Sequence, residues 1–481
     1  MVENRFLCWD DKLIEKSNGV GVFAHKPEKK GLALVCDGEW EGPHNGYACI
    51  VKVGDVYRMY YRACAMKQMA DGTVSNAKAV ICLAESRDGI TFKKPDLQKF
   101  EYNGTKHNNI VFSKSTYIDN FSVFYDTNPD CPDDERFKAL CERNLGSEGG
   151  GTKLIYYASR DGYDFREMRY LDVKGTFDSY NVTFWDEESE RYFLFYRAFH
   201  SADGIDKLSW RGVKKDDIRD IRVATSVDFV NWTIHGRISF EEGQEDYPLY
   251  TNQITKYYRA RSTFIGFPVR YFDRYEDDKS FKFMPLSDRR EKIKEFFGRE
   301  GTALTDCVIM TSEDGFKFNR RDDAFMTPGV ENRSNWWYGN CYTVYGLAET
   351  EAEEDGAPRE ISFYMGENYR IKNVNFRRYT VRLDGFFSWR APYSGGEVFT
   401  KPITVESAEM RINFSTSALG GIKITLCDEA GSVITGYESY TLFGDSVDRP
   451  VEFQKSLSEL IGKRVRLKIE MKDANLYSFV I

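Results

Sequence analysis

A short motif recurs five times in this 481-residue chain, and such self-similarity constrains the fold more than any other feature of the sequence. Each copy ends an apolar, alternating run, turns at Asp-Gly or an equivalent pair, and resumes with an aromatic residue. The turn aspartates are Asp88, Asp161, Asp228, Asp314 and Asp384, at intervals of 73, 67, 86 and 70 residues. The pattern is typical of a β-hairpin, so we interpret the five aspartates as turn formers and not as catalysts.

Two further strand-like segments, rich in Tyr and Phe, precede every copy, as in GYACIVKV and VYRMYYRA before Asp88. Four short antiparallel strands repeated five times predict an all-β fold, a five-bladed β-propeller over residues 1–391. An aromatic content of 15% fits this prediction, because such side chains favour pleated surfaces. Residues 392–481 show six alternating segments between Gly, Asp and Ser turns, which predict a C-terminal β-sandwich as an accessory domain.

Composition argues against several classes of partner. The net charge of −8 and the lack of a basic stripe exclude a nucleic-acid partner. No apolar run reaches the ~18 residues of a membrane span, and no secretory signal pattern opens the chain, so we expect no membrane partner and a cytoplasmic location. The ten cysteines form no C-x-x-C pair and are expected to be free and buried. We predict no metal centre and no cofactor, and leave open a structural cation in the central channel.

The segments before the first strand of each blade converge at one mouth of a propeller, and here they are rich in acids and aromatics. They read CDGEWEGPHNGY, STYIDNFS, GTFDSYN, EDYPLYTNQ and SNWWYGNCY. Glycosidic cleavage needs two carboxyl groups that flank one bond, and crowding of like charges raises the pKa of one of them. We therefore predict Glu41, Asp119 and Asp178 as catalytic residues. The alternatives are a solvated turn residue at Glu41 and an Asx cap at Asp119.

Polar and aromatic side chains of the same mouth are predicted to contact a sugar. They are Trp40, His44, Arg62, Asn120, Asn181, Tyr250, Asn252, Arg270, Trp336, Trp337 and Asn340. The tryptophans would stack on sugar faces, with a place in the core as the alternative. The arginines would contact hydroxyl or anionic groups, with pairing to local acids as the alternative.

The chain resembles the five-bladed propellers of furanose-acting glycoside hydrolases, the invertase, levanase and arabinanase group, and within it a bacterial set with a C-terminal β-sandwich. The resemblance rests on segments such as CLAESRDGITFKKPDL, NGTKHNNIV, FDSYNVTFWDE, RRYTVRLDGFFSW and GGEVFTKPIT. It implies a nucleophile or base at Glu41, an orienting or stabilising acid at Asp119 and a general acid at Asp178. The chain departs from the group at Ile118 to Phe121, where Asn120 is an alternative to Asp119, and it has no N-D-P-N-G motif.

Several functions are compatible with these observations. The first is a glycoside hydrolase that acts on oligosaccharides, with furanosides as one substrate class, and with the acid at Asp178 and the nucleophile or base at Glu41. A glycoside phosphorylase on the same fold is an alternative. So is a carbohydrate-binding propeller without catalytic activity, or a scaffold that binds protein partners on its rim. The oligomeric state is left open.

Overall fold

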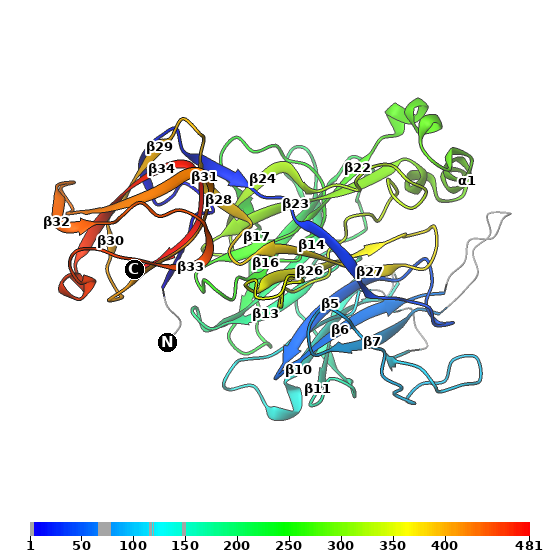
Figure 1. Cartoon of the computed structure of the whole chain (residues 1–481). Coiled ribbons are helices and arrows are strands. Elements are labelled where there is room, and N and C mark those ends of the chain that lie inside the picture. The colour runs from blue at the N-terminus through cyan, green and yellow to red at the C-terminus, as the bar shows by residue number, and fades with distance from the viewer. Residues whose placement is uncertain (1–3, 66–77, 115–117, 119, 147–150) are drawn as a thin grey trace.

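The computed structural model describes residues 4–65, 78–114, 118, 120–146 and 151–481 (Figure 1). Within these ranges the fold is all-β, with one α-helix and four short 3-10 segments. A ten-stranded sheet lies at one end of the molecule, and five smaller antiparallel sheets form a propeller-like arrangement beside it. None of the helices in the described part is long and apolar enough to cross a membrane.

Three of the smaller sheets have four strands and one has five, each built around a meander in chain order. The first contains β5 (Gly46–Val53), β6 (Val56–Ala63), β7 (Val80–Ser86) and β8 (Ile110–Phe112). The second contains β9 (Ser122–Tyr125), β10 (Phe137–Asn144), β11 (Thr152–Ser159) and β12 (Arg166–Tyr170). The third contains β13 (Val182–Asp186), β14 (Arg191–His200), β15 (Asp206–Lys207), β16 (Ile218–Ser226) and β17 (Thr233–Arg237).

The fourth sheet is more complex, with seven strands, and the fifth returns to four. The fourth contains β18 (Ser239–Phe240), β19 (Leu249–Thr251), β20 (Thr255–Lys256), β21 (Phe264–Gly266), β22 (Val269–Asp273), β23 (Ala303–Ser312) and β24 (Lys317–Met326). The fifth contains β25 (Ala348–Thr350), β26 (Glu360–Glu367), β27 (Asn375–Arg382) and β4 (Glu28–Leu34). Because the fourth sheet is no simple meander, the count of five blades stays a prediction.

The N-terminal segment completes the last of these sheets. Strand β4 pairs antiparallel with β27, so that Leu34 lies opposite Phe376 and Glu28 opposite Thr380. This pairing covers an edge of β27 that would otherwise be exposed, and it links the fifth sheet of the ring to the segment that leads into the first. One apolar cluster inside the ring draws buried side chains from the first four sheets, among them Cys49, Val123, Val182 and Leu249, and from Tyr345, just before β25.

The recurrent aspartates lie where the sequence placed them, directly after the third strand of each meander. In the first four copies the aspartate Oδ1 accepts hydrogen bonds from the Ser hydroxyl two residues earlier and from the backbone N–H groups two and three residues later. These bonds fix the turn at Asp88, Asp161, Asp228 and Asp314, which confirms the interpretation as turn formers.

Asp384, the fifth copy, has a different role, because Arg382 replaces the serine two residues earlier. Its fully buried carboxylate accepts hydrogen bonds from Tyr257 Oη at 2.6 Å, Arg259 Nε at 2.8 Å and Ser478 Oγ at 2.7 Å. A fourth contact, to Arg5 Nη1 at 3.4 Å, comes from the N-terminal strand. This carboxylate therefore joins the ring, the N-terminal segment and the last strand of the chain.

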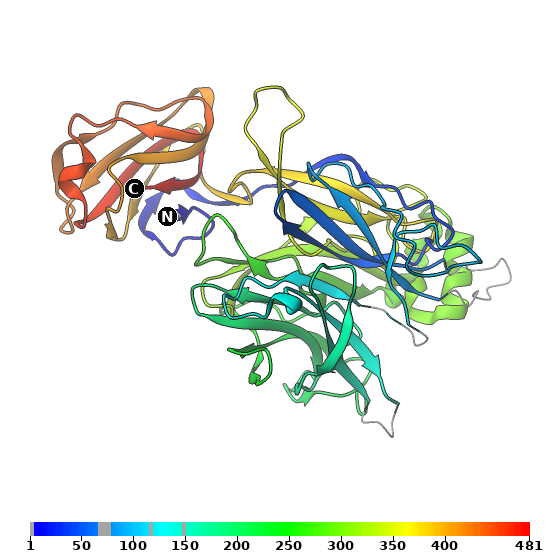
Figure 2. The same cartoon turned by 90° about the horizontal axis from the view of Figure 1, so that it is seen from below.

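The ten-stranded sheet combines both ends of the chain around its own apolar core (Figure 2). Its strands are β1 (Arg5–Leu7), β2 (Ile14–Asn18), β3 (Gly21–Ala24), β28 (Phe387–Ala391), β29 (Gly396–Thr400), β30 (Ile403–Thr404), β31 (Met410–Cys427), β32 (Val433–Glu438), β33 (Asp445–Val451) and β34 (Arg464–Val480). Strands β1, β2 and β3 pair with C-terminal strands although the sequence grouped them with residues 1–391. The boundary at 391 and the β-sandwich stay predictions.

Two strands of the C-terminal region are long. Strand β31 runs through Gly420 and Gly421, and β34 spans 17 residues without a break. A β-bulge between Thr416 and Gly421 absorbs the irregular residues without ending β31. The α-helix in the described part, α1 (Ser287–Phe297), ends at Gly298, whose φ of 55° only glycine adopts at low cost.

We predict that Asp384→Asn lowers the unfolding temperature, because it removes a fully buried charge and leaves the half-buried Arg259 and Arg5 beside a neutral group. The loss is about 3–5 kcal/mol, the usual effect of removing one partner of a buried ion pair. Burial alone would raise the pKa of Asp384, but Arg259 and Arg5 outweigh it and lower the pKa from 3.8. The stabilisation is therefore complete above about pH 4 and declines as the pH falls further.

Thermal unfolding followed by circular dichroism between pH 3 and pH 7 measures this difference. The control is Asp55→Asn, at an exposed turn. Equal unfolding temperatures for the wild type and Asp384→Asn at pH 7 would contradict the role given to this carboxylate.

Candidate active site

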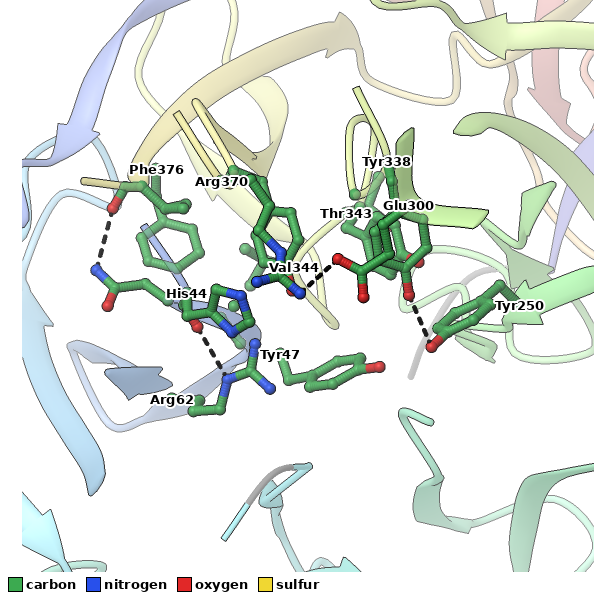
Figure 3. A pocket seen from close by; sticks show the side chains of 18 of the residues that line it. His44, Tyr47, Arg62, Tyr250, Glu300, Tyr338, Thr343, Val344, Arg370 and Phe376 are labelled. Atoms are coloured by element: carbon green, nitrogen blue, oxygen red, sulfur yellow. Dashed lines mark hydrogen bonds and ion pairs between the residues drawn. The ribbon is translucent and has the colours of Figure 1, made fainter. Parts of the chain in front are cut away.

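A pocket of about 220 Å³ opens among the segments that precede the first strands of the sheets (Figure 3). Its wall combines residues from the loop before β5, from β6, from the turn before β13, from β19 and from the 338–344 segment before β25. Three arginines, two carboxylates, one histidine and five tyrosines face it: Arg62, Arg299, Arg370, Asp178, Glu300, His44, Tyr47, Tyr250, Tyr338, Tyr342 and Tyr369. The predicted convergence at one mouth therefore holds for four of the five segments.

Asp178 lies at the apex of a turn that neighbouring side chains hold in place. Asn181 Nδ2 donates to the carbonyls of Phe177 and Ser179, each at 2.9 Å. Asn120 Nδ2 donates to the same Phe177 carbonyl at 2.7 Å, and Arg197 Nε donates to Thr176 O at 2.9 Å. Because four side-chain hydrogen bonds fix this backbone, the Asp178 carboxylate has a defined position at the pocket wall.

Glu142 is the second carboxyl group near this turn. It lies near the end of β10, and its backbone N–H donates to Asn120 Oδ1 at 2.8 Å, so Asn120 ties it to the Asp178 turn. Burial, together with the negative charge of Asp178, raises the pKa of Glu142 to about 7. Arg197, whose Nη2 lies 3.7 Å from Asp178 Oδ2, opposes this increase. The two acids are thus coupled, and Glu142 stays largely protonated up to neutral pH.

The remaining carboxylate of the pocket, Glu300, is paired. Its Oε2 lies 2.5 Å from Arg370 Nη2 (Figure 3). Burial raises the pKa of Glu300, while Arg370 and Arg299 act in the opposite direction. An acid paired with a cation is poorly suited to proton transfer, so we assign Glu300 to the positioning of Arg370.

His44 contributes a neutral ring to the pocket. Its backbone carbonyl accepts a hydrogen bond from Arg62 Nε at 3.1 Å, and its ring stacks on Tyr369 with centroids 5.2 Å apart. Burial, with Arg370 and Arg62 nearby, lowers the pKa of His44 to about 2. The buried Nε2 atom has no hydrogen-bond partner within the described residues, which leaves it available to a ligand hydroxyl.

The tyrosines form a continuous aromatic wall. Ring centroids are 6.4 Å apart for Tyr47 and Tyr342, 5.7 Å for Tyr342 and Tyr250, and 6.1 Å for Tyr250 and Tyr338. Burial raises the pKa of Tyr47, Tyr338 and Tyr342 well above 10, so their hydroxyls keep their protons. A concave wall of aromatic faces with phenolic donors suits a polyhydroxylated ligand such as a sugar.

Glu41 lies outside this pocket. Its fully buried carboxylate accepts hydrogen bonds from Tyr61 Oη at 2.6 Å and Gly38 N at 2.6 Å, and it pairs with Lys94 Nζ at 2.9 Å. These contacts lock the loop before β5 onto the first sheet. Asp119, the third acid that the sequence predicted, lies outside the described residues.

Several other predicted contacts belong to the framework. The side chains with internal partners and no place on the pocket wall are Trp40, Asn120, Asn181, Asn252, Arg270, Trp336, Trp337 and Asn340. Arg270, for example, makes two bonds to Asp306, at 2.8 and 2.6 Å, which is the structural alternative considered for it. Asp178, His44, Arg62 and Tyr250 are the predicted residues that the structure brings together.

Sequence reasoning missed Glu142, Glu300, Arg299, Arg370 and four tyrosines. A signal for Glu142 was present, because it occupies the same place near the end of a second strand as Arg62 in VYRMYYRA and Arg197 in RYFLFYRA. Glu300 and Arg299 lie in a short 3-10 segment after α1, where no repeat pattern marked them. All ten cysteines are free and buried, as expected. Within the described ranges no cluster of three His, Cys, Asp or Glu residues forms a metal site.

The chain matches no protein-family model and no curated protein sequence. The solved structures similar to it include glycoside hydrolases. An N-acetylgalactosamine deacetylase from F. plautii in complex with blood group B trisaccharide has 10% identity and a TM-score of 0.44, over 79% of this chain and 96% of that one. A glycosyl hydrolase from Bacteroides ovatus has 12% identity and a TM-score of 0.38, over 76% and 97%. A GH32 beta-fructofuranosidase from Bombyx mori has 9% identity and a TM-score of 0.40, over 95% and 94%.

Similarities this weak carry no argument about the reaction, so function has to be argued from the pocket.

We predict that Glu41→Gln destabilises the fold by about 1–3 kcal/mol, since it leaves Lys94 without its buried acceptor, and changes any glycoside turnover by no more than a few-fold. Thermal unfolding and turnover of the same preparation test both statements, with the exposed Glu39→Gln as the matched control. If Glu41→Gln kept the unfolding temperature of the wild type but lost all turnover, Glu41 would have to be assigned a catalytic role.

Proposed function

We propose that the protein is a glycoside hydrolase whose pocket binds one unit of a glycoside and cleaves its bond with the carboxyl pair Glu142 and Asp178. The observation that carries the proposal is the coupling of these two acids beside a tyrosine-lined pocket. Burial, together with the charge of Asp178, raises the pKa of Glu142 to about 7, while Asp178 lines the pocket and lies next to Arg197. Acid and base roles require two carboxyl groups in different environments, so that one keeps its proton while the other is charged.

In this proposal Glu142 donates the proton to the leaving oxygen as the glycosidic bond breaks. Asp178 acts on the anomeric carbon, directly as nucleophile or through a water molecule as base. Arg197 Nη2 lies 3.7 Å from Asp178 Oδ2 and places a positive charge beside it. The assignment reverses the role that the family resemblance implied for Asp178, because burial raises the pKa of the half-buried Glu142 to about 7 and suits it to donate a proton.

Substrate class and architecture complete the proposal. Furanosides are the substrate class that the sequence resemblance implies. The five smaller sheets would be five blades of one propeller, with residues 392–481 as an accessory β-sandwich. The pairing of β4 with β27 and the apolar cluster shared by the first four sheets and Tyr345 support this architecture. Asp119 remains a predicted third acid, next to Asn120, which ties Glu142 to the Asp178 turn.

We predict that Glu142→Gln lowers turnover of unactivated glycosides by about 10²–10⁴-fold, the usual contribution of general acid catalysis. Turnover of an aryl glycoside with a good leaving group should persist, because such a group departs without a proton. Asp178→Asn should lose activity on both kinds of substrate. Rates on a panel of aryl glycosides and furanose oligosaccharides measure these differences, with the exposed Glu101→Gln as control.

The wild-type rate should fall as the pH rises through about 7, where Glu142 loses its proton, and Glu142→Gln should lack this limb. Full activity of both variants on every substrate would contradict the assignment. A protein that binds saccharides without turnover of any substrate would instead be the carbohydrate-binding alternative.

A further inference from the structure

Arginines gather at the pocket, although the whole chain has a net charge of −8. His44 beside them is neutral, since burial and two arginines lower its pKa to about 2. Arg370 pairs with Glu300. Arg299, whose charge also acts on Glu300, forms no ion pair among the described residues.

Arg299 belongs to a cluster of three guanidinium groups around two tyrosine rings. Arg219 and Arg299 lie 4.4 and 5.3 Å from the centre of the Tyr271 ring. Arg219 and Arg197 lie 5.5 and 5.4 Å from the centre of the Tyr250 ring. Tyr250 and Arg299 line the pocket, while Arg219 borders a neighbouring cavity behind Tyr250.

The cluster makes few direct ion pairs among the described residues, although the charge of Arg299 acts on Glu300 and that of Arg197 on Glu142. Neither Arg219 nor Arg299 forms an ion pair there, and Arg197 reaches Asp178 only at 3.7 Å. Arg219 Nε and Arg197 Nη2 are buried without a hydrogen-bond partner in the same part of the chain. Burial, Arg197 and Arg299 all lower the pKa of Arg219, which reflects the cost of crowding these charges. An anion that entered the pocket would relieve the repulsion.

We propose that Arg299, backed by the charges of Arg197 and Arg219, forms a subsite for an oxyanion, either a carboxylate on the sugar or a phosphate group. Guanidinium groups bind both through paired, charge-assisted hydrogen bonds. The inference deepens the proposed function by naming an anionic ligand for the same pocket. Anion binding can be measured without turnover, so a failure of this proposal can be distinguished from a failure of the proposed hydrolase activity.

The test is calorimetric titration of the full-length protein with sodium glucuronate, inorganic phosphate and, as the neutral comparison, glucose, at constant ionic strength. We expect saturable binding of at least one of the two anions. Arg299→Gln should weaken it about tenfold or more, as expected for loss of a hydrogen bond to a charged group. Preferential binding of glucuronate would identify an acidic sugar as the ligand. Preferential binding of phosphate would indicate a phosphorylated substrate or a phosphate-dependent reaction.

Two further variants keep the result interpretable. Arg160→Gln removes the same charge from an exposed turn outside the pocket and should bind as the wild type does. Arg299→Lys keeps the charge and should retain more affinity than Arg299→Gln, which a purely structural role would not predict. Equal anion affinity in the Arg299→Gln and Arg160→Gln proteins, or no saturable anion binding by the wild type, would overturn the subsite.

Discussion

The pairing of β4 with β27 is the constraint on which the rest of the structure depends. It brings residue 34 beside residue 376, and the loop that follows β4 crosses directly from the fifth sheet to the first. Hydrogen bonds across this junction are dense: Cys36 N donates to Asn375 Oδ1 at 2.8 Å, and Asn373 Nδ2 donates to Cys36 O at 2.9 Å. The same loop carries His44, so closing the ring also builds one wall of the pocket.

The junction extends to the base of the pocket. Asn45 accepts hydrogen bonds from Gly42 N and Cys64 N at its side-chain oxygen and donates to Val374 O at 3.3 Å. Arg370 N donates to Pro43 O at 2.9 Å, which holds the backbone of the arginine that pairs with Glu300. Residues more than 300 positions apart in the chain therefore define one face of the site. A preorganised wall of this kind reduces the cost of ordering side chains when a ligand binds.

Buried charge is handled in opposite ways in two places. Around Asp384 every charge has a partner, and the carboxylate connects three parts of the chain. Around Tyr250 and Tyr271 three arginines make one close ionic contact within the described residues, that of Arg197 with Asp178 at 3.7 Å. Buried charge without a close partner costs stability, and such sites are the expected places for ligand binding. The contrast separates a structural cluster from the cluster that we propose binds a ligand.

The repeat made much of the fold predictable, because each turn serine and aspartate acts locally. Asp178 was also accessible to sequence reasoning, since it directly precedes an apolar first strand. Glu41 shows the limit of prediction from sequence. The sequence places its loop at the mouth, but in the folded protein Tyr61 and Lys94 hold its carboxylate against the first sheet. Asp384 had a turn sequence and acquired partners from both termini. Charged residues that pair although they are far apart in the chain, such as Glu300 and Arg370, leave no local sequence pattern from which the pair could be predicted.

The coupling of Glu142 to Asp178 is the central claim, and a direct titration tests it. Carboxyl ¹³C chemical shifts of labelled glutamate, assigned by difference with Glu142→Gln, give the pKa of Glu142 in the wild type and in Asp178→Asn. We predict a pKa of about 7 in the wild type and a lower value when Asp178 is neutral, because its charge contributes to the increase. A pKa near the ordinary 4.5 in the wild type, or one that Asp178→Asn leaves unchanged, would contradict the account.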